Sequence, residues 1–128
     1  MKNVTAAIIE SGGLYLLARR GPGESLAGLW EFPGGKVEEG ETFEECVVRE
    51  LLEELSIDVR VLEHFCDSIY RYESGAIKLV AYRVEILGGK MALSVHDLID
   101  WFSPVEMLSL KLAPADIPIA ERLAACPH

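Results

Sequence analysis

Three glutamates in the middle of the chain, Glu50, Glu53 and Glu54, have the spacing of groups that could act together. An α-helix advances about 100° per residue, so a helix over residues 42–55 would place all three carboxylates in one narrow sector. Like charges this close repel one another. Hard divalent ions such as Mg²⁺ prefer oxygen ligands and bridge carboxylates to phosphate oxygens. The cluster is therefore a candidate site for metal-assisted phosphate chemistry.

The helix that would carry these glutamates is well marked. Thr42 and Glu45 have the spacing of a capping box, in which each side chain bonds the backbone of the other residue. Apolar residues then recur with helical spacing at Phe43, Val47, Leu51 and Leu55. For an isolated acidic run of this kind, a merely solvated helix face is the favoured explanation.

The residues upstream of the helix change that balance. The segment from Gly35 to Ile57 reproduces the Nudix box. Gly35 is followed after five residues by Glu41, and after seven more by Arg49-Glu50-Leu51-Leu52-Glu53-Glu54-Leu55 and then Ile57. Only Ser56 departs, where the family motif has glycine. The chain thus resembles the Nudix hydrolases. The helix would end without the residue that most easily adopts a left-handed cap, so we expect a local change in the turn and retained catalysis.

The resemblance covers almost the whole chain. The two-arginine loop at residues 19–25, the segment at residues 29–36 and the closing segment at residues 112–116 look like those of MutT-type nucleoside triphosphate pyrophosphohydrolases. It implies a fold of the α/β (α+β) class, a Nudix α/β/α sandwich with a mixed sheet and a catalytic loop-helix-loop. We expect one such domain over residues 1–128.

The resemblance also implies a metal site. Glu50, Glu53 and Glu54 are expected to bind Mg²⁺, with Mn²⁺ as a possible substitute and the Gly35 carbonyl as a further ligand. Glu53 or Glu54 would also orient or deprotonate the attacking water. Arg49 is expected to hold a site glutamate rather than to touch substrate, because an arginine fork binds a carboxylate through two hydrogen bonds.

Glu41 has two explanations of equal weight. A carboxylate at a helix start stabilises the helix dipole, whereas the family pattern implies support of the catalytic loop through charged partners.

Substrate contacts are expected from residues outside the helix. Arg20 and Lys36 match positions where MutT-type enzymes place basic groups near phosphate. Glu31 is also expected to bind substrate. Asp116 matches an Asn or Asp that bonds the base edge, although it could equally cap the last helix. An ionised Asp116 suits an amino-bearing edge such as cytosine N4, and a protonated one could serve a purine.

Many family members take a further acidic ligand or base from a loop that corresponds to residues 94–98. Val95 stands where glutamate is expected, and His96 and Asp97 follow it. Asp97 is therefore only a possible extra ligand, since a lone acid in a loop is more often solvated.

The resemblance favours magnesium-dependent cleavage of CTP, dCTP or a modified form to the monophosphate and pyrophosphate. Such an enzyme would act in nucleotide-pool cleansing and DNA repair. The same scaffold hosts cleavage of 8-oxo-dGTP, so an oxidised purine remains an alternative. Two further alternatives are an ADP-ribose-type diphosphate substrate and a non-catalytic nucleotide sensor.

The remaining pattern predicts strands, helix, strands, helix. Residues 4–10 and 14–18 predict a hairpin, and residues 57–66, 69–72 and 76–87 look extended. A brief strand is expected at residues 29–32 and another at 101–102, followed by short and C-terminal helices ending near residues 108 and 125.

Bulk composition restricts the partners. A net charge of −9 argues against binding polymeric nucleic acid, which requires many Lys and Arg contacts to phosphate. Three scattered cysteines fit neither a disulfide framework nor a zinc motif, which favours the cytoplasm. No apolar run is long enough to span a membrane. We expect a monomer or homodimer acting on a small nucleotide.

Overall fold

The computed structural model describes residues 1–126, so Pro127 and His128 at the end of the expected domain lie outside the described residues. The elements, in chain order, are β1 (Lys2–Ser11), β2 (Leu14–Arg20), β3 (Trp30–Glu31), α1 (Phe43–Leu55), β4 (Ile57–Tyr72), β5 (Gly75–Gly89), β6 (His96–Phe102), α2 (Pro104–Met107), the 3₁₀ turn η1 (Pro114–Asp116) and α3 (Ile117–Ala125). None of the helices among these residues is long and apolar enough to cross a membrane.

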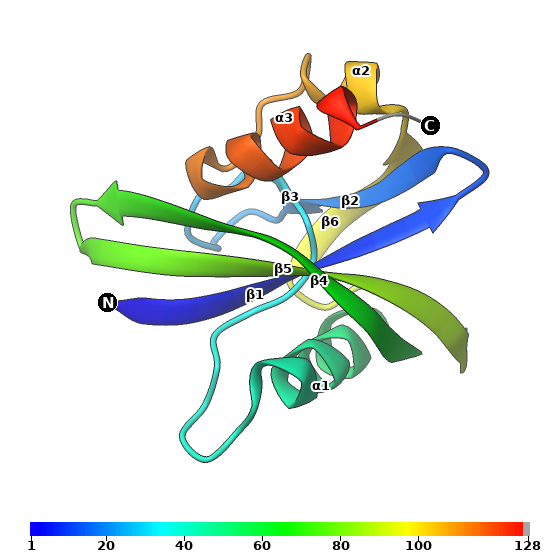
Figure 1. Ribbon diagram of the computed structural model, residues 1–128, viewed down its shortest axis with the longest axis horizontal. Coiled ribbons are helices and arrows are strands. Elements are labelled where there is room, and N and C mark those ends of the chain that lie inside the picture. Colours follow the sequence, from blue (N-terminus) through cyan, green and yellow to red (C-terminus); the bar gives the residue numbers. More distant parts are fainter. Residues whose placement is uncertain (127–128) are drawn as a thin grey trace.

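The strands form a mixed sheet with helices on both sides, as expected. In Figure 1, α1 lies on one side of the sheet and α2 and α3 lie on the other. β1 runs parallel to β5, β4 and β5 are antiparallel, and β2 is antiparallel to both β3 and β6. Parallel neighbours need a long connection, which here includes α1 and β4.

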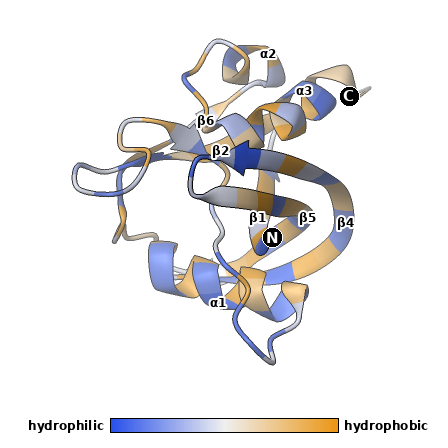
Figure 2. Cartoon of the chain, turned by 90° about the vertical axis from the view of Figure 1, so that its left-hand side faces the viewer, coloured by the Kyte–Doolittle hydropathy of each residue, from blue (hydrophilic) through white to orange (hydrophobic). Residues whose placement is uncertain are grey.

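Alternation along the central strands divides the core into two halves. Ala6 and Ile8 of β1 pack in the cluster that includes α3, whereas Ala7 and Ile9 pack in the cluster that includes α1. Successive side chains of a strand point to opposite faces, so a strand covered on both faces must be apolar throughout. In Figure 2, α1 alternates between hydrophilic and hydrophobic residues along its length, as expected for a helix with one face against the sheet.

The sequence-predicted helix is confirmed, including its start. Thr42 Oγ1 accepts a hydrogen bond from Glu45 N–H at 3.0 Å, and Glu45 Oε1 accepts one from Thr42 N–H at 2.8 Å. Both halves of the capping box are therefore formed. The helix ends at Ser56, which has the left-handed angles φ 58° and ψ 34° that the family glycine adopts without strain.

Three strand predictions were wrong in extent. The hairpin pairing of β1 with β2 is confined to Glu10↔Tyr15 and Ser11↔Leu14, because residues 33–37 bond the edge of β1 that does not pair with β5 over residues 3–7. Residues 57–72 form the single strand β4 rather than two, with irregularities in its register against β5. β6 begins at His96 instead of residue 101, since pairing with β2 extends it. Strand limits depend on distant partners, which local patterns do not contain.

Candidate active site

Burial of one face of α1 fixes the direction of its glutamates. Val47 and Leu51 are fully buried against the sheet. The Glu50 side chain is 14% exposed, whereas that of Glu53 is 59% exposed. Glu54 is half-buried. Glu50 and Glu54 are therefore partly enclosed by the protein, whereas the Glu53 side chain extends into solvent.

The glycine loop lies against both β1 and the helix. Thr5 N–H donates to the Gly35 carbonyl at 2.8 Å, and Ala7 N–H donates to the Pro33 carbonyl at 2.7 Å. A Cβ atom on Gly34 would lie 2.1 Å from the Thr5 carbonyl oxygen, and one on Gly35 would lie 2.3 Å from the carboxyl carbon of Glu50. Both glycines are thus required by close approach, one to backbone and one to a candidate ligand.

Arg49 joins the helix, the loop and the acidic cluster. Its Nε and Nη2 atoms donate to the two oxygens of Glu41 at 2.6 and 3.0 Å. Nη1 donates to Glu50 Oε1 at 2.9 Å and to Glu53 Oε2 at 3.1 Å. Nη2 also donates to the Lys36 carbonyl at 3.0 Å. This matches the expected supporting role of Arg49, which remains a prediction for catalysis.

The Arg49–Glu41 pair stabilises the charged form of both groups. The hydrogen bonds from Arg49, followed by the backbone of Glu38, lower the pKa of Glu41 to about 2. The same pairing raises the pKa of Arg49 above its usual range. Glu41 lies just before the helix but binds Arg49 directly, so the geometry supports the loop-supporting interpretation of Glu41 over a purely dipolar one.

Glu54 is partly buried beside other carboxylates. Its Oε1 atom is buried and has no hydrogen-bond partner among residues 1–126. Burial first, and then the nearby charges of Glu31 and Glu50, raise the pKa of Glu54 to about 8. Burying an ionised group without a partner is costly, and a bound cation would remove that cost.

Arg20 and Glu31 form a second charged group beside the acidic helix. Arg20 Nη1 lies 3.1 Å from Glu31 Oε2, and both side chains are largely buried. His96 Nε2 lies 2.8 Å from the same oxygen. Two of the predicted substrate-binding residues are therefore in contact, and His96 is a third member that the sequence interpretation did not assign. Simple alternation along residues 96–102 would place His96 on the same side as the exposed Leu98 and Asp100, so the sequence pattern did not indicate that His96 is buried.

Asp116 lies at the start of the C-terminal helical segment and is almost completely buried. Its Oδ2 atom accepts a hydrogen bond from Phe32 N–H at 2.8 Å. It makes no side-chain capping bond to α3, so capping does not explain this residue within the described chain. Burial, reinforced by the charge of Glu31, raises the pKa of Asp116 well above its ordinary value.

A cleft of about 140 Å³ lies beside Arg20, Glu31 and Asp116, and over the described residues its lining includes none of the three helix glutamates. Gly34 and Gly35 line it together with Arg20, Glu31 and Asp116. Aromatic and apolar side chains complete the lining, among them Phe32, Tyr72 and Leu79. Mostly apolar walls with a few converging polar groups are typical of small-ligand sites.

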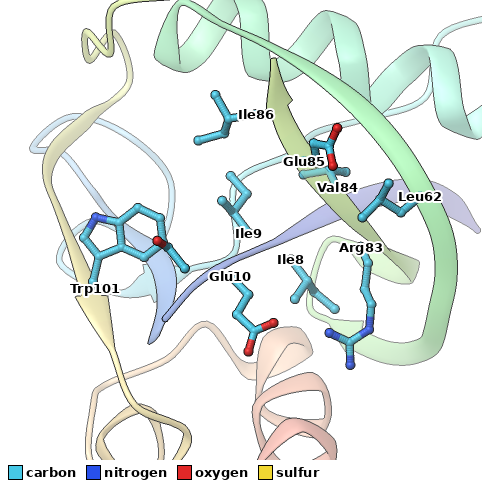
Figure 3. A pocket seen from close by; sticks show the side chains of 10 residues that line it. Ile8, Ile9, Glu10, Leu62, Arg83, Val84, Glu85, Ile86 and Trp101 are labelled. Carbon is cyan, nitrogen blue, oxygen red and sulfur yellow. The ribbon is translucent and has the colours of Figure 1, made fainter. Parts of the chain in front are cut away.

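A larger crevice of about 570 Å³ lies where β1 turns away from β5. Figure 3 shows Ile9, Arg83 and Trp101 around it. Its lining, over the described residues, includes none of the predicted site residues. Tyr82 is buried in the core on the α1 side.

Besides the residues of the acidic cluster, the predicted phosphate-binding Lys36 and the possible extra ligand Asp97 lie outside the cleft lining. Lys36 is exposed, and the cleft lining within residues 1–126 does not include it. The carboxylate of Asp97 is bound by Arg19 through Nε at 2.9 Å and Nη2 at 3.1 Å. Their assigned roles remain predictions, and each side chain would have to move to reach a nucleotide.

The donor set fits a hard divalent cation. Glu50, Glu53 and Glu54 supply carboxylate oxygens, the ligands that Mg²⁺ prefers, and Glu54 contributes an unsatisfied buried oxygen. Among the described residues, no three His, Cys, Asp or Glu side chains are already arranged to hold a metal ion. Arg49 holds both Glu50 and Glu53, so rearrangement of these side chains would accompany metal binding.

Comparison with known proteins agrees with this fold. The NUDIX domain family description matches residues 1–123. The CTP pyrophosphohydrolase of Escherichia coli K12 is 43% identical over 125 residues, covering 98% of this chain and 93% of that protein. The 8-oxo-dGTP diphosphatase of the same organism is 34% identical, covering 84% and 83%. The crystal structure of MutT from Methanosarcina mazei Go1 superimposes with a TM-score of 0.87 at 25% identity, covering 95% and 91%.

The chain belongs to the NUDIX domain family. Within that family it is a MutT-like Nudix hydrolase, an enzyme of the nucleotide pyrophosphohydrolase class.

Proposed function

We propose that this enzyme hydrolyses a cytidine nucleotide, CTP, dCTP or a modified dCTP, to the monophosphate and pyrophosphate with Mg²⁺. The observation that carries the proposal is the cleft in which Asp116, Glu31 and Arg20 line the same space as Gly34 and Gly35. A base recognised near Asp116 would thus have its phosphates directed to the loop that covers the acidic helix.

Several residues of the chain have separate roles in the proposed hydrolysis. Bound by Glu50, Glu53 and Glu54, Mg²⁺ would neutralise the triphosphate and acidify a water molecule. Glu53 or Glu54 accepts the proton of that water as the new P–O bond forms and the bridging P–O bond breaks. Arg49 orients Glu50 and Glu53, and one water is consumed for each pyrophosphate released.

Phosphate binding is assigned to Arg20 and Lys36. Arg20 already lines the cleft, and Lys36 is the basic residue next to Gly35. A flexible lysine on the loop can reach a phosphate as a mobile point charge, whereas the arginine offers a fixed fork.

Asp116 is the proposed base-reading residue. Its Oδ2 atom accepts a hydrogen bond from Phe32 N–H, so Oδ1 is the atom that would hydrogen-bond the base. Ionised, it accepts from the cytosine amino group; protonated, it donates to a ring acceptor. The E. coli relative named CTP pyrophosphohydrolase supports the cytosine assignment.

An oxidised purine triphosphate is the second candidate. The raised pKa of Asp116 favours the protonated form, which can donate a hydrogen bond to a purine. A relative named 8-oxo-dGTP diphosphatase supports this alternative. Both candidates share the metal site and differ only at the base.

We assign the enzyme to the cytoplasm, as a single domain acting as monomer or homodimer in nucleotide-pool cleansing. Among the described residues, Cys46, Cys66 and Cys126 are free thiols, and the first two are buried. Thiols of this kind suit a reducing compartment.

A substrate panel tests the proposal. CTP, dCTP, 5-methyl-dCTP, 8-oxo-dGTP, ATP and ADP-ribose are incubated with Mg²⁺, and released pyrophosphate, phosphate and nucleoside monophosphate are quantified. The proposal requires the highest kcat/KM on a cytosine triphosphate with pyrophosphate as product. Preference for 8-oxo-dGTP would favour the second candidate, and cleavage confined to ADP-ribose would reject both.

Glu53→Gln provides the matching variant, with Glu121→Gln on the exposed side of α3 as control. Glu53→Gln should abolish turnover and preserve the fold, and Glu121→Gln should do neither. An active Glu53→Gln protein would show that the metal site is misplaced. Binding of a nucleotide without turnover by the wild type would identify a sensor.

A further inference from the structure

We propose that His96 is a positioning residue for substrate recognition, which holds Glu31 and, through it, Arg20 in the orientation that binds the nucleotide. This inference rests on the proposed function, because Glu31 and Arg20 are the substrate-binding residues that His96 supports. It adds a residue from β6 to a site otherwise built from β2, β3, α1 and η1.

A bulge in β6 directs His96 into the protein. Arg19 pairs with Leu98, but Arg20 pairs with His96, so Asp97 is the extra residue of β6. A bulge of this kind reverses the inward and outward alternation locally and re-aims side chains. Asp97 consequently faces solvent and binds Arg19, while the His96 side chain is fully buried.

The contact of His96 is directional. Glu31 presents a carboxylate, which only accepts, so His96 Nε2 donates to Glu31 Oε2 across 2.8 Å. Its other nitrogen, Nδ1, is buried and has no partner among residues 1–126. A polar ring retained in the interior with half of its hydrogen-bonding capacity unused is costly, and the bond to Glu31 is the interaction that offsets this cost.

The arrangement leaves part of Glu31 free for a ligand. Both hydrogen bonds that the described residues make to this carboxylate, from Arg20 and from His96, end on Oε2. Oε1 therefore remains available, and Glu31 lines the cleft. With His96 absent, Arg20 alone would hold Glu31, and the orientation of the pair would then depend on the bond that Arg20 Nε donates to the Ser25 carbonyl.

The test is a double-mutant cycle in the full-length enzyme with Mg²⁺ and the best substrate of the panel. His96→Leu keeps the approximate size and removes the donor, whereas His96→Gln keeps a donor near the position of Nε2. His96→Leu should raise KM roughly tenfold or more, as expected for loss of a hydrogen bond to a charged group. kcat should change less than threefold, because the carboxylates of α1 are untouched. His96→Gln should recover most of the lost KM.

The second arm uses Glu31→Ala, which removes the oxygen that accepts from His96. If His96 acts through Glu31, adding His96→Leu to Glu31→Ala should change KM by less than twofold. An unchanged KM in His96→Leu, an equal increase of KM in the Glu31→Ala background, or a parallel loss of kcat in both His96 variants would overturn the inference. Failure of the wild type on every nucleotide would instead refute the proposed function, so the two failures are distinct.

Discussion

Gly35 and Glu50 are in direct contact: a Cβ atom on Gly35 would lie 2.3 Å from the carboxyl carbon of Glu50 and 2.5 Å from each of its oxygens. The carboxyl group is the end of a flexible side chain and can move away. Gly35→Ala should therefore fold, with a Tm within a few degrees of wild type, but lose about 10- to 100-fold in kcat because Glu50 is displaced from Arg49. Steady-state kinetics with Mg²⁺ and thermal unfolding provide the two measurements.

Gly34→Ala is the matched comparison. Its Cβ atom would meet the Thr5 carbonyl at 2.1 Å, and this backbone belongs to β1 at the centre of the sheet. We expect a clear fall in Tm for this variant. Equal losses of stability in the two variants would contradict the assignment of Gly35 to the carboxylate.

Arg49→Lys should lower kcat by about 10- to 100-fold while the protein remains folded. A lysine carries the charge but cannot make the two-point bond to Glu41 and also reach Glu50 and Glu53. The measurement is kcat as a function of Mg²⁺ concentration. Arg60→Lys serves as control, because Arg60 forms an exposed pair with Glu85 away from the cluster. Full activity of Arg49→Lys would mean that Arg49 supplies charge alone.

Ser56→Gly should stabilise the protein by about 0.5–1 kcal/mol. Ser56 has φ 58°, a conformation that glycine adopts without the steric cost of a Cβ atom. Thermal unfolding should show an increase of about 1–4 °C in Tm with unchanged kcat. Ser74→Gly, in an exposed turn, should not raise Tm. A loss of stability in Ser56→Gly would indicate that the serine makes a compensating interaction.

Asp116→Asn should increase stability at neutral pH. The pKa of Asp116 in the folded protein is raised by burial, so the folded state binds the proton more tightly than the unfolded chain, whose aspartates titrate near 3.9. The contribution of Asp116 to the free energy of unfolding of the wild type is fully present below about pH 4, and it is lost as pH rises toward the pKa of Asp116 in the folded protein. Asparagine does not ionise, and its amide oxygen can still accept from Phe32 N–H.

The Tm advantage of Asp116→Asn over wild type should therefore be smallest near pH 4 and should grow as pH rises to 8. Thermal unfolding across this range measures it. Asp58→Asn, at an exposed residue of β4, is the control. A difference that does not depend on pH would show that Asp116 does not carry a raised pKa.

Local patterns predicted the catalytic helix because all of its determinants lie within the segment itself. The capping pair Thr42 and Glu45 and the buried repeat of Val47, Leu51 and Leu55 need no distant partner. The strands were harder to delimit. β1 takes most of its hydrogen bonds from β5, about 75 residues further along the chain, and no local pattern distinguishes that partner from the adjacent β2.

The sequence by itself determined the family, through the resemblance of residues 35–57 to the Nudix box, and the acidic cluster, because helical spacing brings Glu50, Glu53 and Glu54 to one side. Only the tertiary structure decided which distant residues meet them. Folding places the Gly35 backbone against Glu50, brings Asp116 and Glu31 into one cleft, and uses a bulge to turn His96 inward and Asp97 outward. These contacts depend on strand register and close packing between segments far apart in the chain, which residue spacing does not encode.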